Sequence, residues 1–120
     1  MSYEIEFYKK AGQERSPANE YLDAMQEKHR QKALAIMARL EQEGPNLKRP
    51  HADVLSGSKI RELRCGFHNL EHRFLYFFAN KVIVITHGFL KKTDPVPQGE
   101  INRAEQAMED WIRRTKGRSK

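Results

Sequence analysis

The chain has 120 residues and a formal net charge of +6, with 38% hydrophobic and 32% charged residues. That length suits a single domain with one modest core. The composition excludes fibrous and membrane-spanning classes, because no apolar run approaches the roughly 20 residues that a span needs.

The expected compartment and partners follow from the cysteine count and the charge. Cys65 has no second cysteine to pair with, and the first residues lack the pattern of a signal peptide. We therefore expect a cytoplasmic protein without a membrane partner. The basic excess favours a polyanionic partner, although an acidic protein partner or solubility alone would account for it equally well.

The first elements are a strand and a helix start. Residues 3–8 alternate apolar and glutamate side chains, which predicts a half-buried strand. Ser16 and Pro17 then predict the beginning of a helix, since serine caps a helix and proline suits its first turn.

Two helices are predicted over residues 18–43, which contain no proline or glycine. The apolar positions stop and resume around a polar stretch, so we expect a helical hairpin with a break near residues 27–30. One long kinked helix is the alternative. Gly44 and Pro45 end this region, and a polar linker follows over residues 46–56.

Strand patterns follow over residues 60–65, 72–79 and 82–89, and the third is apolar on both faces, as in a central strand. A final amphipathic helix is predicted over residues 98–114. The basic residues 115–120 are expected to fray as a flexible tail.

This order of elements predicts an α+β fold, with the helices packed against one face of a small antiparallel sheet. Residues 1–114 are expected to form the single domain.

The predicted strands and the segment after them carry several cationic side chains. Successive side chains of a strand point to opposite faces, so Glu62 and Arg64 share one face and Arg73 lies on the neighbouring strand. An isolated arginine of this kind usually points to solvent at an edge. Two of them, followed by Lys91 and Lys92 at the next strand end, predict a cationic concavity suited to a phosphodiester.

The histidines and the cysteine can be explained by structural roles as well as by functional ones. His87 is either a structural histidine or a proton-transfer group near the cations. His68 and His72 are four apart but not on a helix, so no metal site is predicted. We expect His29 and His51 to be solvated, and Cys65 to be packed rather than nucleophilic.

Three short motifs occur in order: ELR at residues 62–64, HRFLYFF at 72–78 and HGFLKKT at 87–93. With Pro97, the Glu100–Ile101 pair and Ala104 beyond them, they resemble the phage-derived HigB-like branch of the RelE toxin superfamily. The likeness covers almost the whole chain. It implies a RelE-like fold, a helix-turn-helix antitoxin as partner, and metal-independent cleavage of mRNA in the ribosomal A site without a cofactor.

Carried over by position, Arg64 and Arg73 match the arginines of the family, and Lys91 and Lys92 match its lysine pair. Glu62 stands where some members place a lysine, and the tyrosine that some members carry near the end of their last segment is missing. The expected RNA contacts are Lys59, Arg61, Glu62 and His68.

In the expected mechanism the arginines stabilise the phosphorane, and Lys91, Lys92, His87 or Glu62 transfers protons. Arg73→Ala is accordingly predicted to abolish toxicity while leaving a folded protein. The competing reading is a non-catalytic RNA- or DNA-binding module, or a degenerate toxin that serves only as an antitoxin partner.

Overall fold

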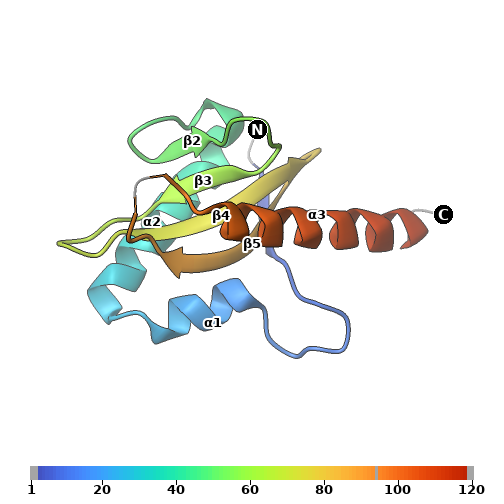
Figure 1. The fold of residues 1–120 in the computed structure, drawn as a ribbon, viewed down its shortest axis with the longest axis horizontal. Coiled ribbons are helices and arrows are strands. Elements are labelled where there is room, and N and C mark those ends of the chain that lie inside the picture. Colours follow the sequence, from blue (N-terminus) through green and yellow to red (C-terminus); the bar gives the residue numbers. More distant parts are fainter. Residues whose placement is uncertain (1–2, 94, 119–120) are drawn as a thin grey trace.

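The computed structural model describes residues 3–93 and 95–118, which form an α+β fold around a five-stranded sheet (Figure 1). The elements, in chain order, are β1 (Glu4–Phe7), α1 (Pro17–Ala24), α2 (Glu27–Glu43), the short 3-10 helix η1 (Gly44–Asn46), β2 (Ala52–Val54), β3 (Arg61–Arg64), β4 (His72–Ala79), β5 (Val82–Leu90) and α3 (Gln98–Arg118).

The sheet is mixed, so the predicted antiparallel sheet is wrong at one edge. The strand order is β1-β5-β4-β3-β2, and β1 pairs with β5 in parallel. The two helices between β1 and the later strands carry the chain across one face, which is the kind of long connection that parallel pairing requires. The opposite edge is β2, a three-residue strand within the segment that we took for a linker.

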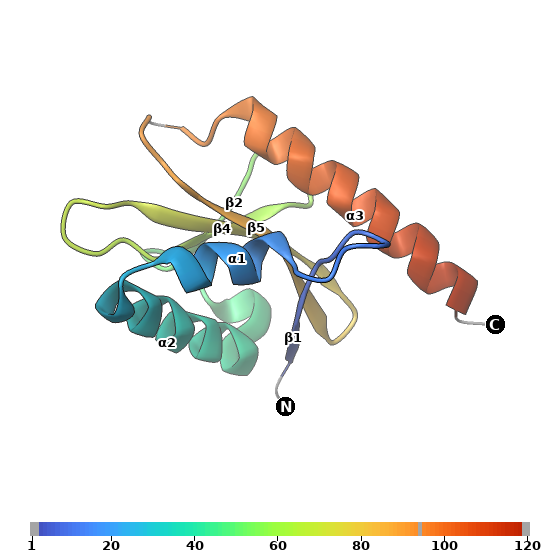
Figure 2. The same cartoon turned by 90° about the horizontal axis from the view of Figure 1, so that it is seen from below.

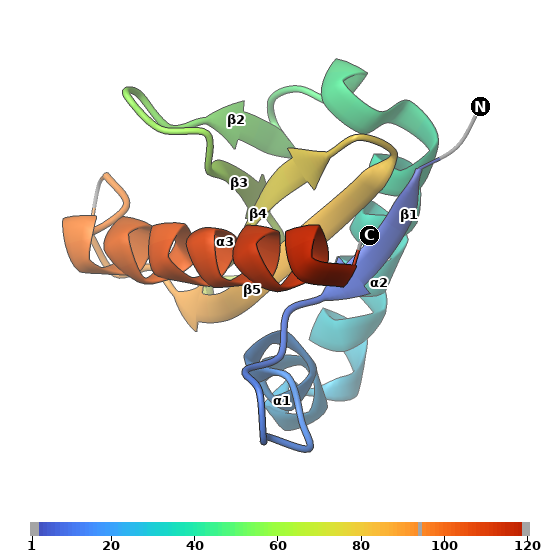
Figure 3. The ribbon, with the colours of Figure 1, turned by 90° about the vertical axis from the view of Figure 1, so that its right-hand side faces the viewer.

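Helices cover both faces of the sheet, and the prediction that they all pack on one face is wrong. Figures 2 and 3 show α1 and α2 on one side of the strands and α3 on the other. Strand parity explains this arrangement. Phe74 and Tyr76 of β4 pack in the core under α1 and α2, whereas Leu75 and Phe77 pack in the core under α3. An apolar strand with two buried faces needs a helix layer on each.

A β-bulge changes the parity of β5. Leu75 pairs with His87 and Tyr76 with Ile85, so Thr86 is the extra residue. The Thr86 hydroxyl donates to the Leu75 carbonyl at 3.2 Å. The bulge places His87 on the α3 face of the sheet, because it pairs with Leu75.

The helix boundaries follow the local sequence. The Ser16 hydroxyl accepts a hydrogen bond from the Asn19 amide at 3.1 Å and caps α1 as predicted. The break between the helices falls at Met25 and Gln26, both extended, directly before the predicted residues 27–30, and a single long helix is excluded. Arg30 donates to the carbonyls that end α1. Because α1 packs mainly on β5 and α2 on β1 and η1, the hairpin packing stays a prediction.

The last helix is longer than predicted. It continues to Arg118, so residues 115–118 of the expected tail are helical, and residues 119–120 lie outside the described part. Within that part, no helix has both the length and the apolarity to span a membrane.

Gly88 fixes the packing of α1 on the sheet. A β-carbon at Gly88 would lie 2.7 Å from the Phe74 ring and 2.8 Å from the Tyr21 ring. We expect Gly88→Ala to lower the free energy of unfolding by about 1–3 kcal/mol through overpacking. Gly99→Ala is the matched control, because a β-carbon there meets nothing within 4 Å. Urea denaturation of both variants checks this, and equal stabilities would contradict it.

Candidate functional site

The buried carboxylate of Glu62 joins three of the predicted cations. Glu62 is 2% exposed. Arg73 Nε donates to its Oε2 at 2.7 Å, and Arg64 Nε donates to its Oε1 at 3.4 Å. Lys91 Nζ lies 3.8 Å from Glu62 Oε2. The structure therefore gathers cations from β3, β4 and the end of β5 around Glu62, as predicted for a cationic cluster.

The strand register explains why carboxylates are needed here. Arg64 lies directly opposite Arg73 in the β3–β4 pair, and like charges in that position repel. Glu62 lies between them, Glu71 bonds to Arg73 Nη2 at 3.0 Å, and Asp53 lies 3.5 Å from Arg64 Nη2. The cluster is thus an ion-pair network rather than a set of free cations.

A cleft of about 360 Å³ opens beside this network. Its walls include three residues from the segment predicted as a linker, Arg49, Asp53 and Leu55, none of which is among the predicted site residues. Arg49 donates to Asp53 Oδ2 through Nη2 at 2.7 Å and through Nε at 2.9 Å. These bonds are the main reason that the pKa of Asp53 is lowered. The feature of the sequence that could have revealed this pair is the spacing of four residues between the oppositely charged Arg49 and Asp53.

The cations of the cluster differ in how far their N–H donors are already hydrogen-bonded within the protein. All three nitrogens of the buried Arg73 guanidinium are used, by Glu62, Glu71 and the His72 carbonyl. Arg64 is 29% exposed and its two charged contacts are long, at 3.4 and 3.5 Å. Lys91 lines the cleft, and among the described residues the one ion pair of its side chain is the 3.8 Å contact to Glu62. Arg64 and Lys91 are therefore the residues best placed to meet a phosphate, whereas Arg73 holds the cluster together.

The other expected RNA contacts, and Lys92 of the expected catalytic residues, do not line the cleft. Arg61 is on the opposite face, with its guanidinium 5.1 Å from the Phe78 ring. His68 is exposed in the β3–β4 turn beside Phe67. Lys59 and Lys92 are exposed and line none of the cleft.

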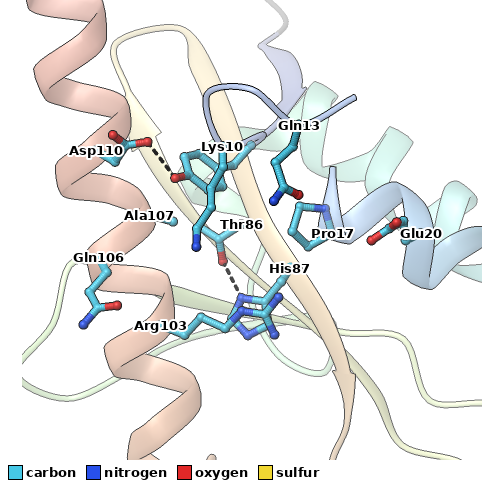
Figure 4. A pocket seen from close by; sticks show the side chains of 11 residues that line it. Lys10, Gln13, Pro17, Glu20, Thr86, His87, Arg103, Gln106, Ala107 and Asp110 are labelled. Carbon is cyan, nitrogen blue, oxygen red and sulfur yellow. Dashed lines mark hydrogen bonds between the residues drawn. The ribbon is translucent and has the colours of Figure 1, made fainter. Parts of the chain in front are cut away.

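His87 is placed apart from the arginine cluster. It is 1% exposed, and it lines a second cavity between α1, β5 and α3 (Figure 4). Its Nε2 lies 2.8 Å from Glu100 Oε1 and its Nδ1 lies 3.0 Å from the Thr86 hydroxyl. Burial, followed by the charge of Arg103, lowers the pKa of His87. This geometry does not place His87 within reach of a phosphate in the cleft.

A second histidine network lies under α1 and α2. The Tyr21 hydroxyl is hydrogen-bonded to His72 Nδ1 at 2.7 Å, and His72 Nε2 to His29 Nδ1 at 2.9 Å. His29 is 5% exposed, so the expectation that it is solvated is wrong. Cys65 is packed as expected, and burial raises the pKa of its thiol to about 12. In the described residues, no three His, Cys, Asp or Glu side chains are grouped for a metal.

This network makes stability depend on pH. Burial, then the neighbouring His29 and Arg73, lowers the pKa of His72 from its ordinary 6.5. The unfolded chain therefore takes up this proton at a higher pH than the folded chain does. The contribution of His72 to the free energy of unfolding is complete above about pH 6.5 and is lost as the pH falls toward its pKa in the folded state. The pKa of His87 is also lowered, so His87 changes the stability in the same direction.

We expect the free energy of unfolding, measured with urea, to fall between pH 7.5 and pH 5.5. His72→Gln should flatten that slope. A slope that is unchanged in His72→Gln would refute this assignment.

Comparison with protein families gives one result. The family model described as "Phage derived protein Gp49-like (DUF891)" matches residues 20–109, well over half of the chain. The match includes Glu62, Arg64, Arg73 and Lys91. A search of curated proteins finds no match.

Proposed function

Because the chain belongs to the family of phage-derived Gp49-like proteins, a toxin-like family of toxin–antitoxin systems, we propose that it is a type II toxin with a RelE-like fold. In this proposal it is an endoribonuclease that cuts messenger RNA on the translating ribosome, without a metal or cofactor, and acts in the cytoplasm.

The observation that carries the proposal is the open cleft beside the Glu62 network. Arg64 and Lys91 line this cleft with donors whose carboxylate contacts within the described part of the chain are all long. A charged donor with spare hydrogen-bonding capacity in a partly desolvated cleft suits a phosphate oxygen. The RNA phosphate would replace the long contacts to Glu62 with shorter ones.

In the proposed reaction the 2′-hydroxyl oxygen attacks the adjacent phosphorus and the bond to the 5′-oxygen breaks, which leaves a 2′,3′-cyclic phosphate. Arg64 and Lys91 stabilise the phosphorane. Two proton transfers accompany these steps, from the 2′-hydroxyl and to the 5′-oxygen. The lowered pKa of Asp53 makes its carboxylate a poor proton acceptor, so Glu62 and Lys91 are the remaining carriers at the cleft. Glu62 also positions the cations.

Membership of a toxin family implies an antitoxin partner in general. We propose the helix-turn-helix type for this partner. The ribosome and its RNA would orient the message, which would compensate for the small number of proton carriers that the cleft offers.

Induced expression in bacteria separates a nuclease from a binding module. A nuclease arrests growth and leaves transcripts with new ends inside translated regions, and co-expression of the antitoxin relieves both effects. Growth arrest with intact transcripts would instead support the non-catalytic alternative. The observation that favours this alternative is that Arg73 already donates hydrogen bonds to Glu62 and Glu71.

A further inference from the structure

A second cavity, which the proposed function does not use, lies on the α1 side of α3. It measures about 370 Å³ and lies between the loop after β1, the start of α1, β5 and α3. Figure 4 shows Lys10 reaching over it from the loop and Arg103 reaching over it from α3, with Thr86 and His87 below them. The volume lies within the range of small-molecule sites.

Four of the polar side chains around this cavity are donors that have no partner among the described residues. The side chains of Lys10 and Arg103 are exposed and make no ion pair or hydrogen bond within the described residues. The same holds for the side-chain amides of Gln13 and Gln106, which line the same walls. Two cations and two amides on facing elements form a donor set for an anion with several oxygens.

The two acidic groups that line the cavity offset its two cations only in part, because one of them, Asp110, is already engaged. The Asp110 carboxylate already accepts hydrogen bonds from the Tyr8 hydroxyl at 2.7 Å and from Arg114 at 2.8 Å. Glu20 is exposed at the α1 wall. The remaining walls are apolar and are formed by Tyr8, Pro17 and Ala107.

We propose that this cavity binds a phosphate ester of nucleotide size, with Lys10 and Arg103 on the phosphate and the apolar wall beside the rest of the ligand. A free nucleotide and a nucleotide unit of an RNA strand present the same chemistry. The site is independent of the Glu62 cleft and of cleavage there.

His87 reports on the occupancy of this site. It faces Thr86 on β5, Glu100 and Arg103 on α3, Lys10 on the loop and Glu20 on α1. A bound anion offsets the charge of Arg103, which is one cause of the lowered pKa of His87. Binding should therefore raise the pKa of His87, and by linkage the ligand should bind more tightly as the pH falls.

The test is NMR titration of the His87 ring in the full chain with inorganic phosphate, adenosine 5′-monophosphate and a short RNA oligonucleotide. We expect at least one phosphate ester to shift the His87 resonance, raise its pKa and bind more tightly at pH 6 than at pH 8. Arg103→Gln and Lys10→Gln should each weaken binding by about tenfold. Lys116→Gln, which removes one charge from α3 outside the cavity, should leave it unchanged.

The outcomes separate the sources of the ligand. Binding of the mononucleotide supports a free nucleotide, and binding of the oligonucleotide alone supports an RNA strand. The proposal is overturned if no ligand shifts His87, if inorganic phosphate binds as tightly as the esters, or if Arg103→Gln binds as well as the wild type. Because binding is measured, loss of RNA cleavage would not affect the result.

Discussion

Replacing Glu62 with alanine is expected to lower the free energy of unfolding by about 3–5 kcal/mol. The reason is the charge that the substitution leaves behind. Arg73 is buried, and its Nε donates to Glu62 at 2.7 Å. Without that carboxylate the guanidinium stays buried with a weakened set of partners and directly opposite Arg64. Urea denaturation at neutral pH measures the loss.

Glu71→Ala is the matched control for this prediction. Glu71 bonds to the same guanidinium at 3.0 Å, but its side chain is 51% exposed, so solvent replaces its contact. We expect a loss below about 1 kcal/mol. The double variant Glu62→Leu/Arg73→Met removes both buried charges and should recover much of the stability. Equal, small losses in Glu62→Ala and Glu71→Ala would show that Glu62 does not hold the cluster.

This account changes the expectation for Arg73→Ala. The sequence analysis predicted a folded but inactive variant. Because Arg73 compensates the buried Glu62, we now expect its loss to destabilise the fold as well. Arg73 is therefore a poor first choice for testing catalysis, and Arg64 is a better one.

Arg64→Gln is expected to lower the rate of RNA cleavage on the order of 100- to 1,000-fold, since one well-placed transition-state donor has that value. The fold should survive, because Arg64 is partly exposed and its ion pairs are long. Cleavage of a translated message by the purified protein, with urea denaturation alongside, measures both quantities.

Arg61→Gln gives a matched control on the same strand. Arg61 is three residues from Arg64, but it lies on the opposite face and packs on the Phe78 ring. The same loss of charge there should leave cleavage near the wild-type rate. A comparable loss of cleavage in both variants would point to a general effect of charge rather than to the cleft.

The sequence predicted most elements because their signals are local. The Ser16–Pro17 start of α1 follows from capping, and the limits of β4 follow from its flanking turns. The parity of β3 placed Glu62 and Arg64 on one face. The parallel pairing of β1 and the second helix layer depend on contacts between distant segments, which no local pattern records.

The candidate site was predictable only in part, for the same reason. Parity identified the cations but not the register that sets Arg64 opposite Arg73, nor the bonds that occupy Arg73. Arg49 and Asp53 came from a segment without a strand pattern. From the sequence, His87 is either a structural histidine or a proton-transfer group near the cations. The structure buries it against Glu100 beside a different cavity.

Mapping of 5′ ends on messenger RNA in programmed ribosomes tests the central claim most directly. Wild-type protein, Arg64→Gln and Arg61→Gln are compared on the same message, with and without ribosomes. The account predicts new ends inside the translated region with the wild type and Arg61→Gln, and almost none with Arg64→Gln. Intact messages with the folded wild-type protein, or cleavage that is unchanged in Arg64→Gln, would contradict it.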